Sequence, residues 1–197
     1  MKLLENKAIS VVLMVVLTAA GTWLGGWKGL SSLYSKAEDV FFVGEDGDGI
    51  CIENDLSERA AAAGNMVTIA RKYLGDSQEV KALSDASSAL TATGKNRDIA
   101  ARLSANQALD TAMTALYQRL ETENLSSQDE TYRQRLYADF NSRNDTISHD
   151  PYNQYAQTYN QTLAGFPANL LAALTPVHEA VLSVSYTHLT LPTIPWV

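Results

Sequence analysis

The chain begins with a long apolar segment. No charged residue occurs from Ala8 to Trp27, and Lys7 and Lys28 flank this run. About 20 helical residues at 1.5 Å each span roughly 30 Å, the hydrocarbon thickness of a bilayer. Trp23 and Trp27 stand at its end, where indole rings favour the membrane interface. Because the run outlasts the apolar core of a signal peptide, we expect a retained single-pass transmembrane helix over residues 8–27.

Apolar residues then recur every three to four positions, the period of a helix with one buried face. The first such stretch continues from the apolar run to about Val43, and no proline interrupts the chain between Lys28 and Asp150. The later apolar positions are Leu56, Ala60, Ala63, Val67, Ala70, Leu74, Val80, Leu83, Leu90, Ile99, Leu103, Leu109, Met113, Leu116, Leu120, Tyr132, Leu136, Phe140 and Ile147. Those of 96–120 approach the 3.5-residue repeat of a coiled coil. No convincing strand precedes Val184, so we predict an all-α fold: an N-terminal transmembrane helix followed by an antiparallel bundle of long helices.

Turn and capping residues mark the expected helix ends. The glycine-rich stretch GEDGDG (44–49) predicts a turn, and ENLSSQDE (123–130) predicts a return loop. The expected caps and ends are Asn54 or Asp55 before the second helix, Gly75 after it, Ser77 and Gly94 around the third, and a start near Asn96 for the fourth. Asp150 followed by Pro151 predicts a restart of the last helix.

Three aromatic residues near the end share one helix face. Tyr152, Tyr159 and Phe166 are spaced by seven, nearly two helical turns, and Asn153 and Asn160 follow the tyrosines. We expect all three rings to pack between helices, with the asparagine amides hydrogen-bonded beside them. Ligand binding by this stripe is the less favoured alternative.

Charge and cysteine content narrow the function classes. The 197-residue chain has a net charge of −7, which argues against a nucleic-acid partner and against attraction to anionic lipid. Cys51 is the sole cysteine, so no intrachain disulfide or thiolate metal cluster can form.

The flanks of the apolar run say little about its orientation. Lys2 and Lys7 precede it and Lys28 and Lys36 follow it, and the free amine favours a cytoplasmic N-terminus only weakly. The bundle, with Cys51, is then expected on the outer side. Gly21, Gly25 and Gly29 recur at every fourth residue, a spacing that permits self-association of membrane helices, although glycine is also simply common there.

Candidate chemistry is sparse. The acidic turn lacks the first and last ligands of a calcium loop, and His149, His178 and His188 have no metal-site spacing. His149 beside Asp150 indicates a turn hydrogen bond rather than a catalytic dyad. We therefore predict no catalytic residue, no cofactor site and no metal site.

The chain resembles the LemA family of bacterial membrane proteins. The resemblance rests on Phe41 to Leu74 (FFVGEDGDGICIENDLSERAAAAGNMVTIARKYL), with its early Arg59, and on Leu136 to Leu174 (LYADFNSRNDTISHDPYNQYAQTYNQTLAGFPANLLAAL). It covers about residues 1–176 and implies a helical bundle on one transmembrane helix, with no catalytic residues. Val184 to Val197 (VSYTHLTLPTIPWV) departs from it and resembles translated adapter sequence.

We accordingly expect three regions: a membrane anchor at 1–27, a LemA-like helical bundle at 28–176 and a disordered or artefactual non-family tail at 177–197. Two functions fit these features. The favoured one is a non-enzymatic interaction or scaffold protein of the bacterial envelope with an unknown protein partner. The alternative is an enzyme with a carboxylate-lined interhelical site, for instance at Asp46, Asp48 and Asp55.

Overall fold

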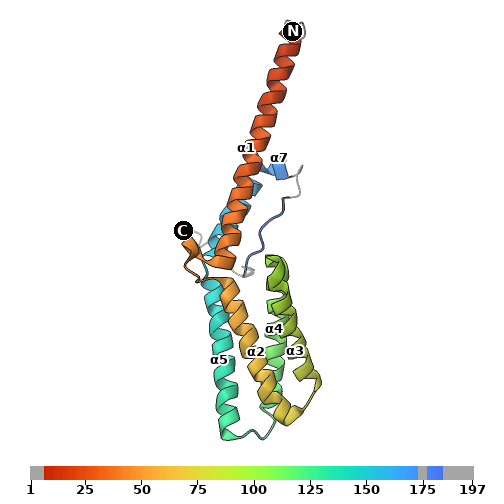
Figure 1. The fold of residues 1–197 in the computed structure, drawn as a ribbon, viewed down its shortest axis with the longest axis vertical. Helices are drawn as coiled ribbons and strands as arrows, with labels where there is room; N and C mark the ends of the chain where they lie inside the picture. Colours follow the sequence, from red (N-terminus) through yellow and green to blue (C-terminus); the bar gives the residue numbers. More distant parts are fainter. Residues whose placement is uncertain (1–6, 173–176, 184–197) are drawn as a thin grey trace, which may run out of the picture.

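The computed structural model describes residues 7–172 and 177–183, and every regular element in these ranges is helical (Figure 1). The α-helices are α1 (Lys7–Val43), α2 (Ile52–Leu74), α3 (Gln78–Thr93), α4 (Ile99–Leu120), α5 (Ser127–His149), α6 (Tyr152–Ala164) and α7 (Ala168–Ala172). Two 3-10 turns, η1 (Glu45–Gly47) and η2 (Gly94–Asn96), lie between them. The predicted all-α fold is confirmed over these residues.

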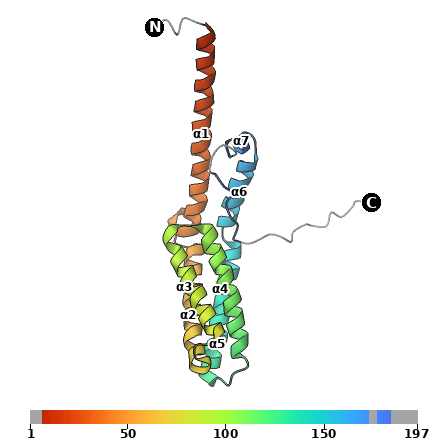
Figure 2. The same cartoon turned by 90° about the vertical axis from the view of Figure 1, so that its right-hand side faces the viewer.

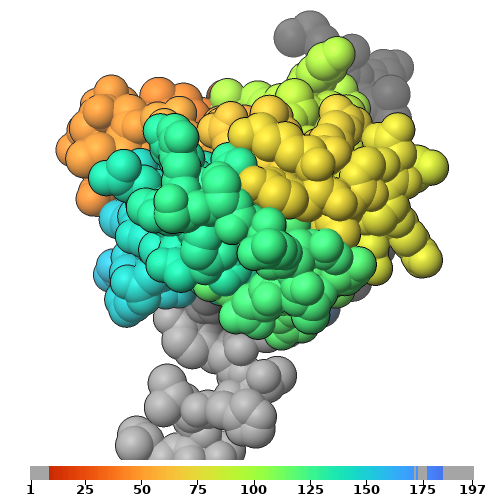
Figure 3. Space-filling view, turned by 90° about the horizontal axis from the view of Figure 1, so that it is seen from below, coloured from red at the N-terminus to blue at the C-terminus, as the bar shows by residue number. Residues whose placement is uncertain are grey.

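The helices form two stacked groups. α2, α3, α4 and α5 run alternately up and down as an antiparallel four-helix bundle, in which α2 packs against α3 and α5, and α3 against α4. Beyond one end of this bundle, α1 and α6 pack together as a second pair, with α7 beside α1 (Figure 2). At the opposite, distal end the α2–α3 and α4–α5 connections lie side by side (Figure 3). A hydrogen bond of 2.7 Å from the Tyr73 hydroxyl at the end of α2 to Asp129 at the start of α5 joins these two helices there.

The core contains the apolar faces that the periodicity predicts. Leu56, Ala63, Val67 and Ala70 of α2 are buried, as are Ile99, Leu103, Leu109, Met113, Leu116 and Leu120 of α4. The extension of α1 beyond the apolar run is also confirmed, since Leu30, Ala37, Val40 and Phe41 are buried. Tyr132 is the exception among the predicted α5 positions and is 48% exposed.

Two helix starts differ from the expected positions. α2 starts at Ile52 with Cys51 as its N-cap, so the prediction of Asn54 or Asp55 is wrong. Burial explains the earlier start, because Cys51 and Ile52 are 3% and 0% exposed. α4, expected to start near Asn96, begins at Ile99, and the Asp98 carboxylate caps it by accepting the Ala101 N–H at 2.9 Å. The helix begins after Asp98 because the Asp98 side chain forms the hydrogen bond to a free backbone N–H that an N-cap residue provides.

The other boundary signals agree with the structure. Gly75 follows α2 with φ 57°, and the Ser77 hydroxyl accepts the Val80 N–H at the start of α3. Asp150 accepts the Tyr152 N–H at 2.8 Å where the chain restarts as α6. At the acidic turn, Gly44 has φ 95°, and a Cβ there would lie 2.7 Å from the Ile50 carbonyl oxygen. Glycine is therefore required at that position.

The segment 177–183 packs along α6 beyond the expected domain boundary at residue 176. Ala180 is buried there at 7% exposure, and Ser183 is hydrogen-bonded to Asn153. These contacts place residues 177–183 with the folded domain, because they satisfy polar groups on both partners. The expectations for Val184 to Val197, and for His188, lie outside the described residues.

Candidate functional site

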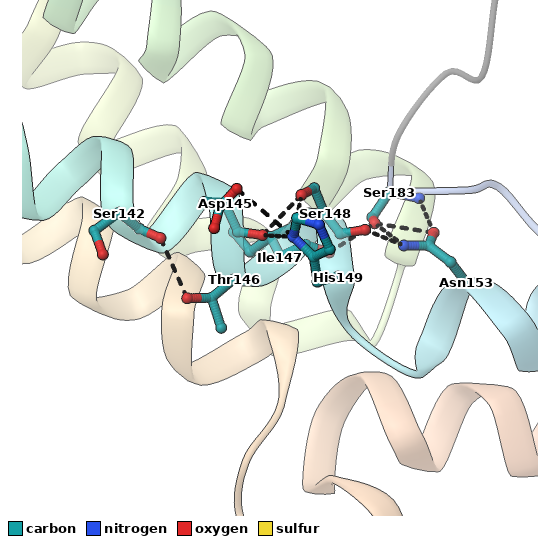
Figure 4. Close-up of polar contacts among 8 residues, drawn as sticks. All are labelled: Ser142, Asp145, Thr146, Ile147, Ser148, His149, Asn153 and Ser183. Atoms are coloured by element: carbon teal, nitrogen blue, oxygen red, sulfur yellow. Dashed lines mark hydrogen bonds and ion pairs between the residues drawn. The ribbon is translucent and has the colours of Figure 1, made fainter. Parts of the chain in front are cut away.

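The α6 helix carries a set of polar contacts that we call the α6 ladder: Tyr152, Asn153, Tyr159 and Asn160. The Asn160 amide donates to the Ala180 carbonyl and accepts from the Ala180 N–H, both at 2.8 Å. Seven residues earlier on the same helix, the Asn153 amide donates to the Ser183 hydroxyl at 2.8 Å and accepts the Ser183 N–H at 2.9 Å (Figure 4). The expected hydrogen bonding of both amides is confirmed, and their partner is an extended segment of the same chain.

Both tyrosines of the ladder reach the same segment. The Tyr159 hydroxyl donates to the His178 carbonyl at 3.0 Å, and the Tyr152 hydroxyl donates to the Val181 carbonyl at 2.5 Å. Seven helical residues rise about 10.5 Å and three extended residues span about 10 Å. The seven-residue spacing on α6 therefore matches a three-residue spacing on the extended segment.

The rings of the ladder also fix α6 against α1. Tyr34 and Tyr159 meet edge to face with ring centroids 5.4 Å apart, and Phe41 and Tyr152 do so at 5.1 Å. Burial raises the pKa of both the Tyr152 and Tyr159 hydroxyls, so they remain protonated donors at neutral pH. The prediction that the aromatic stripe packs between helices is correct for Tyr152 and Tyr159 but wrong for Phe166, which is 83% exposed. α6 ends at Ala164, and so Phe166 leaves the helical face.

The α1 helix divides into a bare half and a packed half. From Val11 to Leu24 its large apolar side chains are mostly more than half exposed, whereas Leu30 is 5% exposed and Phe41 fully buried. Within the described chain, α1 contains one segment long and apolar enough to cross a membrane, and none of its most apolar window is buried. A Cβ added at Gly21, Gly25 or Gly29 would meet nothing within 4 Å, so that face is open.

The three carboxylates considered for catalysis have separate environments. Asp46 is exposed on η1, and Asp48 accepts the Ile50 N–H at 2.9 Å. Asp55, on α2, is 5% exposed and pairs with Arg143 of α5 at 3.1 Å. Asp48 thus has a structural contact within the turn, and Asp55 has one at the α2–α5 interface.

A fourth carboxylate, Asp150, was missed as a candidate because it was assigned to capping. It is 7% exposed, and burial raises its pKa, with smaller contributions from the negative charges of Asp55, Asp48 and Glu45. Its hydrogen bond from the Tyr152 N–H opposes this rise. Asp150 thus acts as the cap of α6 in an acidic surrounding.

A buried arginine joins three helices of the bundle. Arg59 is fully buried, and its Nη1 donates to Asn106 at 2.6 Å and to Asn144 at 3.1 Å. Its Nη2 contacts Asp110 at 2.5 Å, and its guanidinium lies 3.8 Å from the Phe140 ring centroid. Burial lowers the pKa of Arg59, and Asp110 opposes the shift. A cavity of about 490 Å³ opens beside this cluster and extends to Ser183.

Two further arginines are buried in the same way. Arg102 donates to Glu53 at 2.8 Å, and Arg133 donates to the Tyr117 carbonyl at 2.9 Å. The sequence contained the signal for all three, because each arginine lies three or four residues from apolar positions of the same face. The chemistry of these residues was missed because the apolar positions alone were used to define the core.

Neither described histidine takes part in a site. His149 is exposed, and its Nδ1 lies 2.9 Å from the Asp145 carbonyl oxygen and 3.0 Å from the Ser148 hydroxyl (Figure 4). It therefore hydrogen-bonds within its own helix end rather than to Asp150. His178 is exposed and offers its backbone carbonyl to Tyr159. Over residues 7–172 and 177–183, no group of three or more His, Cys, Asp or Glu side chains is placed to hold a metal ion.

Comparison with known proteins identifies one family. No curated protein and no solved structure matches the chain. The model of the LemA family matches residues 50–187, which include α2 to α7 and the segment packed on the α6 ladder. This match covers more than half of the 197 residues and agrees with the resemblance seen in the motifs. The chain belongs to the LemA family.

Proposed function

We propose that this protein is a non-enzymatic, membrane-tethered interaction protein of the bacterial envelope, with α1 as its single-pass anchor. The observation that carries the proposal is the continuity of α1, which runs unbroken from Lys7 to Val43. Its first half exposes apolar side chains, and its second half packs on α6. A bilayer around the first half would remove this apolar surface from water.

The continuous helix would also set the position of the bundle. Because no flexible linker separates the bare half from Leu30, the first buried residue of α1, the bundle would stand at a fixed height and angle above the lipid. Such an arrangement suits a protein that presents helix surfaces to a partner near the membrane. The glycine face of α1, being open, is available for pairing with a second copy.

The polar interior supports a structural role more than a catalytic one. Arg59, Arg102 and Arg133 are each paired with groups on the chain, and Asp55 is paired with Arg143. The alternative of a carboxylate-lined site rests on the raised pKa of Asp150 near Asp55. Catalysis there would require a substrate to displace either the Tyr152 N–H from Asp150 or Arg143 from Asp55.

The proposal is tested with the intact chain in its host membrane. An enzyme for proximity labelling is fused after the full chain and, as a control, after residues 1–43 alone. We expect the full chain to label a reproducible set of neighbours that the anchor control does not label. Identical neighbours for both fusions would contradict an interaction role for the bundle, and loss of the full chain from the membrane fraction at alkaline pH would contradict the anchor.

Orientation requires a different thiol from Cys51. Cys51 is 3% exposed and burial raises its pKa, so a maleimide would react with it poorly. Cys51→Ser combined with Lys95→Cys places a thiol at an exposed position of η2. If the bundle lies outside, an impermeant maleimide should label this variant on intact cells; labelling only after permeabilisation would place the bundle in the cytoplasm.

A further inference from the structure

Phe166 is the most exposed large apolar side chain of the described residues, at 83%. It follows α6 directly and is succeeded by α7, whose Leu170 is 57% exposed. Single exposed apolar residues are common on proteins, whereas two on one short corner form a patch that calls for an apolar neighbour. The corner formed by Phe166, Pro167 and Leu170 is called the α6–α7 corner below.

The height of this corner follows from the register between α1 and α6. The two helices are antiparallel, and their ring contacts pair Phe41 with Tyr152 and Tyr34 with Tyr159. Each step is seven residues on both helices, so Ala164, the last residue of α6, lies near the level of Gly29 on α1. Trp27 ends the uncharged run of α1 and is 37% exposed. Pro167, the residue after Phe166, lines a cavity together with Trp23 and Gly26 of α1, so the corner lies at the expected edge of the bilayer.

The corner also borders an apolar groove on α1. A cavity of about 780 Å³ is lined by Pro167 and Leu170 on one side and by α1 on the other. Its α1 wall consists of Met14, Val15, Thr18, Ala19, Thr22, Trp23 and Gly26. No lining residue is charged, and the α1 wall lies wholly inside the segment expected to cross the membrane. Figure 1 shows α7 beside α1 on the N-terminal side of the bundle.

We propose that the α6–α7 corner is a second membrane contact, which inserts Phe166 and Leu170 into the interfacial layer while the groove between α7 and α1 takes lipid acyl chains. This inference rests on the proposed membrane anchor. The groove is continuous with the anchor's lipid-facing surface, and both are uncharged. With a net charge of −7, the chain would gain this contact from apolar burial rather than from attraction to anionic headgroups.

This second contact has a mechanical consequence for the bundle. A single helix sets the height of the bundle but leaves it free to rotate about the helix axis, whereas a helix and a corner on one side of it fix which face of the bundle turns toward the lipid. The α6 ladder holds the corner's helix against α1 through Tyr152 and Tyr159. The orientation of the bundle surfaces would then be set by α1 together with α6 and α7, which follow it along the chain only after the whole four-helix bundle.

Single spin labels on the full chain test the inference. In a Cys51→Ser background, cysteine replaces Phe166, and two reference variants carry cysteine at Leu17 of the bare α1 half or at Tyr132 of α5. Leu17 and Tyr132 are 63% and 48% exposed, so each label should be tolerated. The proteins are reconstituted in phosphatidylcholine vesicles, and the accessibility of each label to oxygen and to a water-soluble nickel chelate is measured.

We expect the oxygen-to-nickel accessibility ratio at position 166 to exceed that at position 132 several-fold and to approach that at position 17. The result should persist when the protein is diluted in lipid and when anionic lipid is added. A water-exposed label at 166 with a lipid-exposed label at 17 overturns the second contact and leaves the anchor intact. Water-exposed labels at both positions overturn the anchor as well. Protection at 166 that disappears on dilution in lipid assigns the corner to a second copy and also overturns the inference.

Discussion

The four-helix bundle of α2 to α5 and the pair of α1 and α6 are held together by different chemistry. Each must join helices through polar groups that are buried. In the bundle, charged arginines do so: Arg59 binds Asp110 and two asparagines, and Arg102 binds Glu53. In the α1–α6 pair, neutral Tyr159 and Asn160 bind backbone groups of the segment 177–183.

The difference follows from what surrounds each region. A buried ion pair must recover the cost of removing two charges from water, and the partner of Arg59 reduces that cost because Asp110 is 48% exposed. If α1 spans a bilayer as proposed, this route is less available to the α1–α6 pair, since lipid offers no water to a charged partner. Neutral hydroxyls and amides that bond to backbone satisfy both sides without any charge.

The largest effect is expected for Tyr159→Ala. This change removes a ring that is 1% exposed, its contact with Tyr34 and its hydrogen bond to His178. Loss of a buried aromatic side chain costs about 4 kcal/mol of the free energy of unfolding. Thermal unfolding of the full chain in detergent, followed by circular dichroism, measures it. Tyr132→Ala is the exposed control, and an equally small loss in both variants would show that the α6 ladder does not stabilise the pair.

Arg59→Ala should destabilise the bundle by about 3 kcal/mol, because it removes packing on Phe140 and leaves Asn106 without its buried partner. The matched control is Arg71→Ala, since Arg71 is 55% exposed and its contact to Asp76 is 3.5 Å long. That change should alter stability by no more than about 0.5 kcal/mol. The same unfolding assay applies, and equal effects in the two variants would contradict a structural role for the buried charge.

A smaller and more local effect is expected for Asn160→Ala. It removes both hydrogen bonds to Ala180 and should cost about 2 kcal/mol. Amide hydrogen exchange should become faster in residues 177–183 while α2 to α5 keep their protection. Asn65→Ala, at an exposed position of α2, is the control. Unchanged exchange at Ala180 would mean that the ladder does not hold this segment.

The smallest effect concerns pH and Asp150. Its pKa in the folded state is raised by burial, so the ionised form destabilises the fold above that pKa. As pH falls from the raised pKa to the ordinary one, the folded state binds the proton first, and stability from this group rises. Asp150→Asn should therefore be the more stable protein at pH 7, with a difference that shrinks on acidification.

Asp129 provides the opposite case for the same titration. Hydrogen bonds from Tyr73 and Lys72 lower its pKa, so its stabilisation is present above the ordinary pKa and is lost as pH falls through the lowered one. Unfolding at several pH values between 3 and 7 compares Asp150→Asn and Asp129→Asn with the parent. Parallel pH profiles for the two variants would contradict the opposite signs.

The local sequence pattern was sufficient to predict the helices and the continuation of α1 beyond the apolar run. The positions of Leu56, Ala63, Leu109 and Met113 on buried faces followed from periodicity, because a helix places every third or fourth residue on one side. Periodicity failed at Phe166, where the spacing of seven continued after the helix had stopped. A pattern in sequence retains its meaning only while the backbone geometry that produces it continues.

The candidate site was less accessible from the sequence. The tyrosines and asparagines of the α6 ladder were recognised as a stripe, but their partner is a segment about 20 to 30 residues further on, bound mainly through its backbone. Backbone groups are the same for every residue type, so no side-chain pattern in 177–183 could reveal the pairing. Arg59 was visible on an apolar face, whereas its contacts with Asp110 and Asn144 come from two other helices.

The sequence by itself determined the all-α class, the uncharged length of residues 8–27 and the family, since these depend on composition, period and motif. The tertiary structure decided which carboxylate pairs with Arg59 and which residue of α1 packs against Tyr159. It also decided that Phe166 is exposed, beside the apolar groove. The physical reason is the distance along the chain over which the determining interactions act. Helix period and apolar length are set by neighbours within a few residues, whereas burial and pairing depend on how distant helices come together.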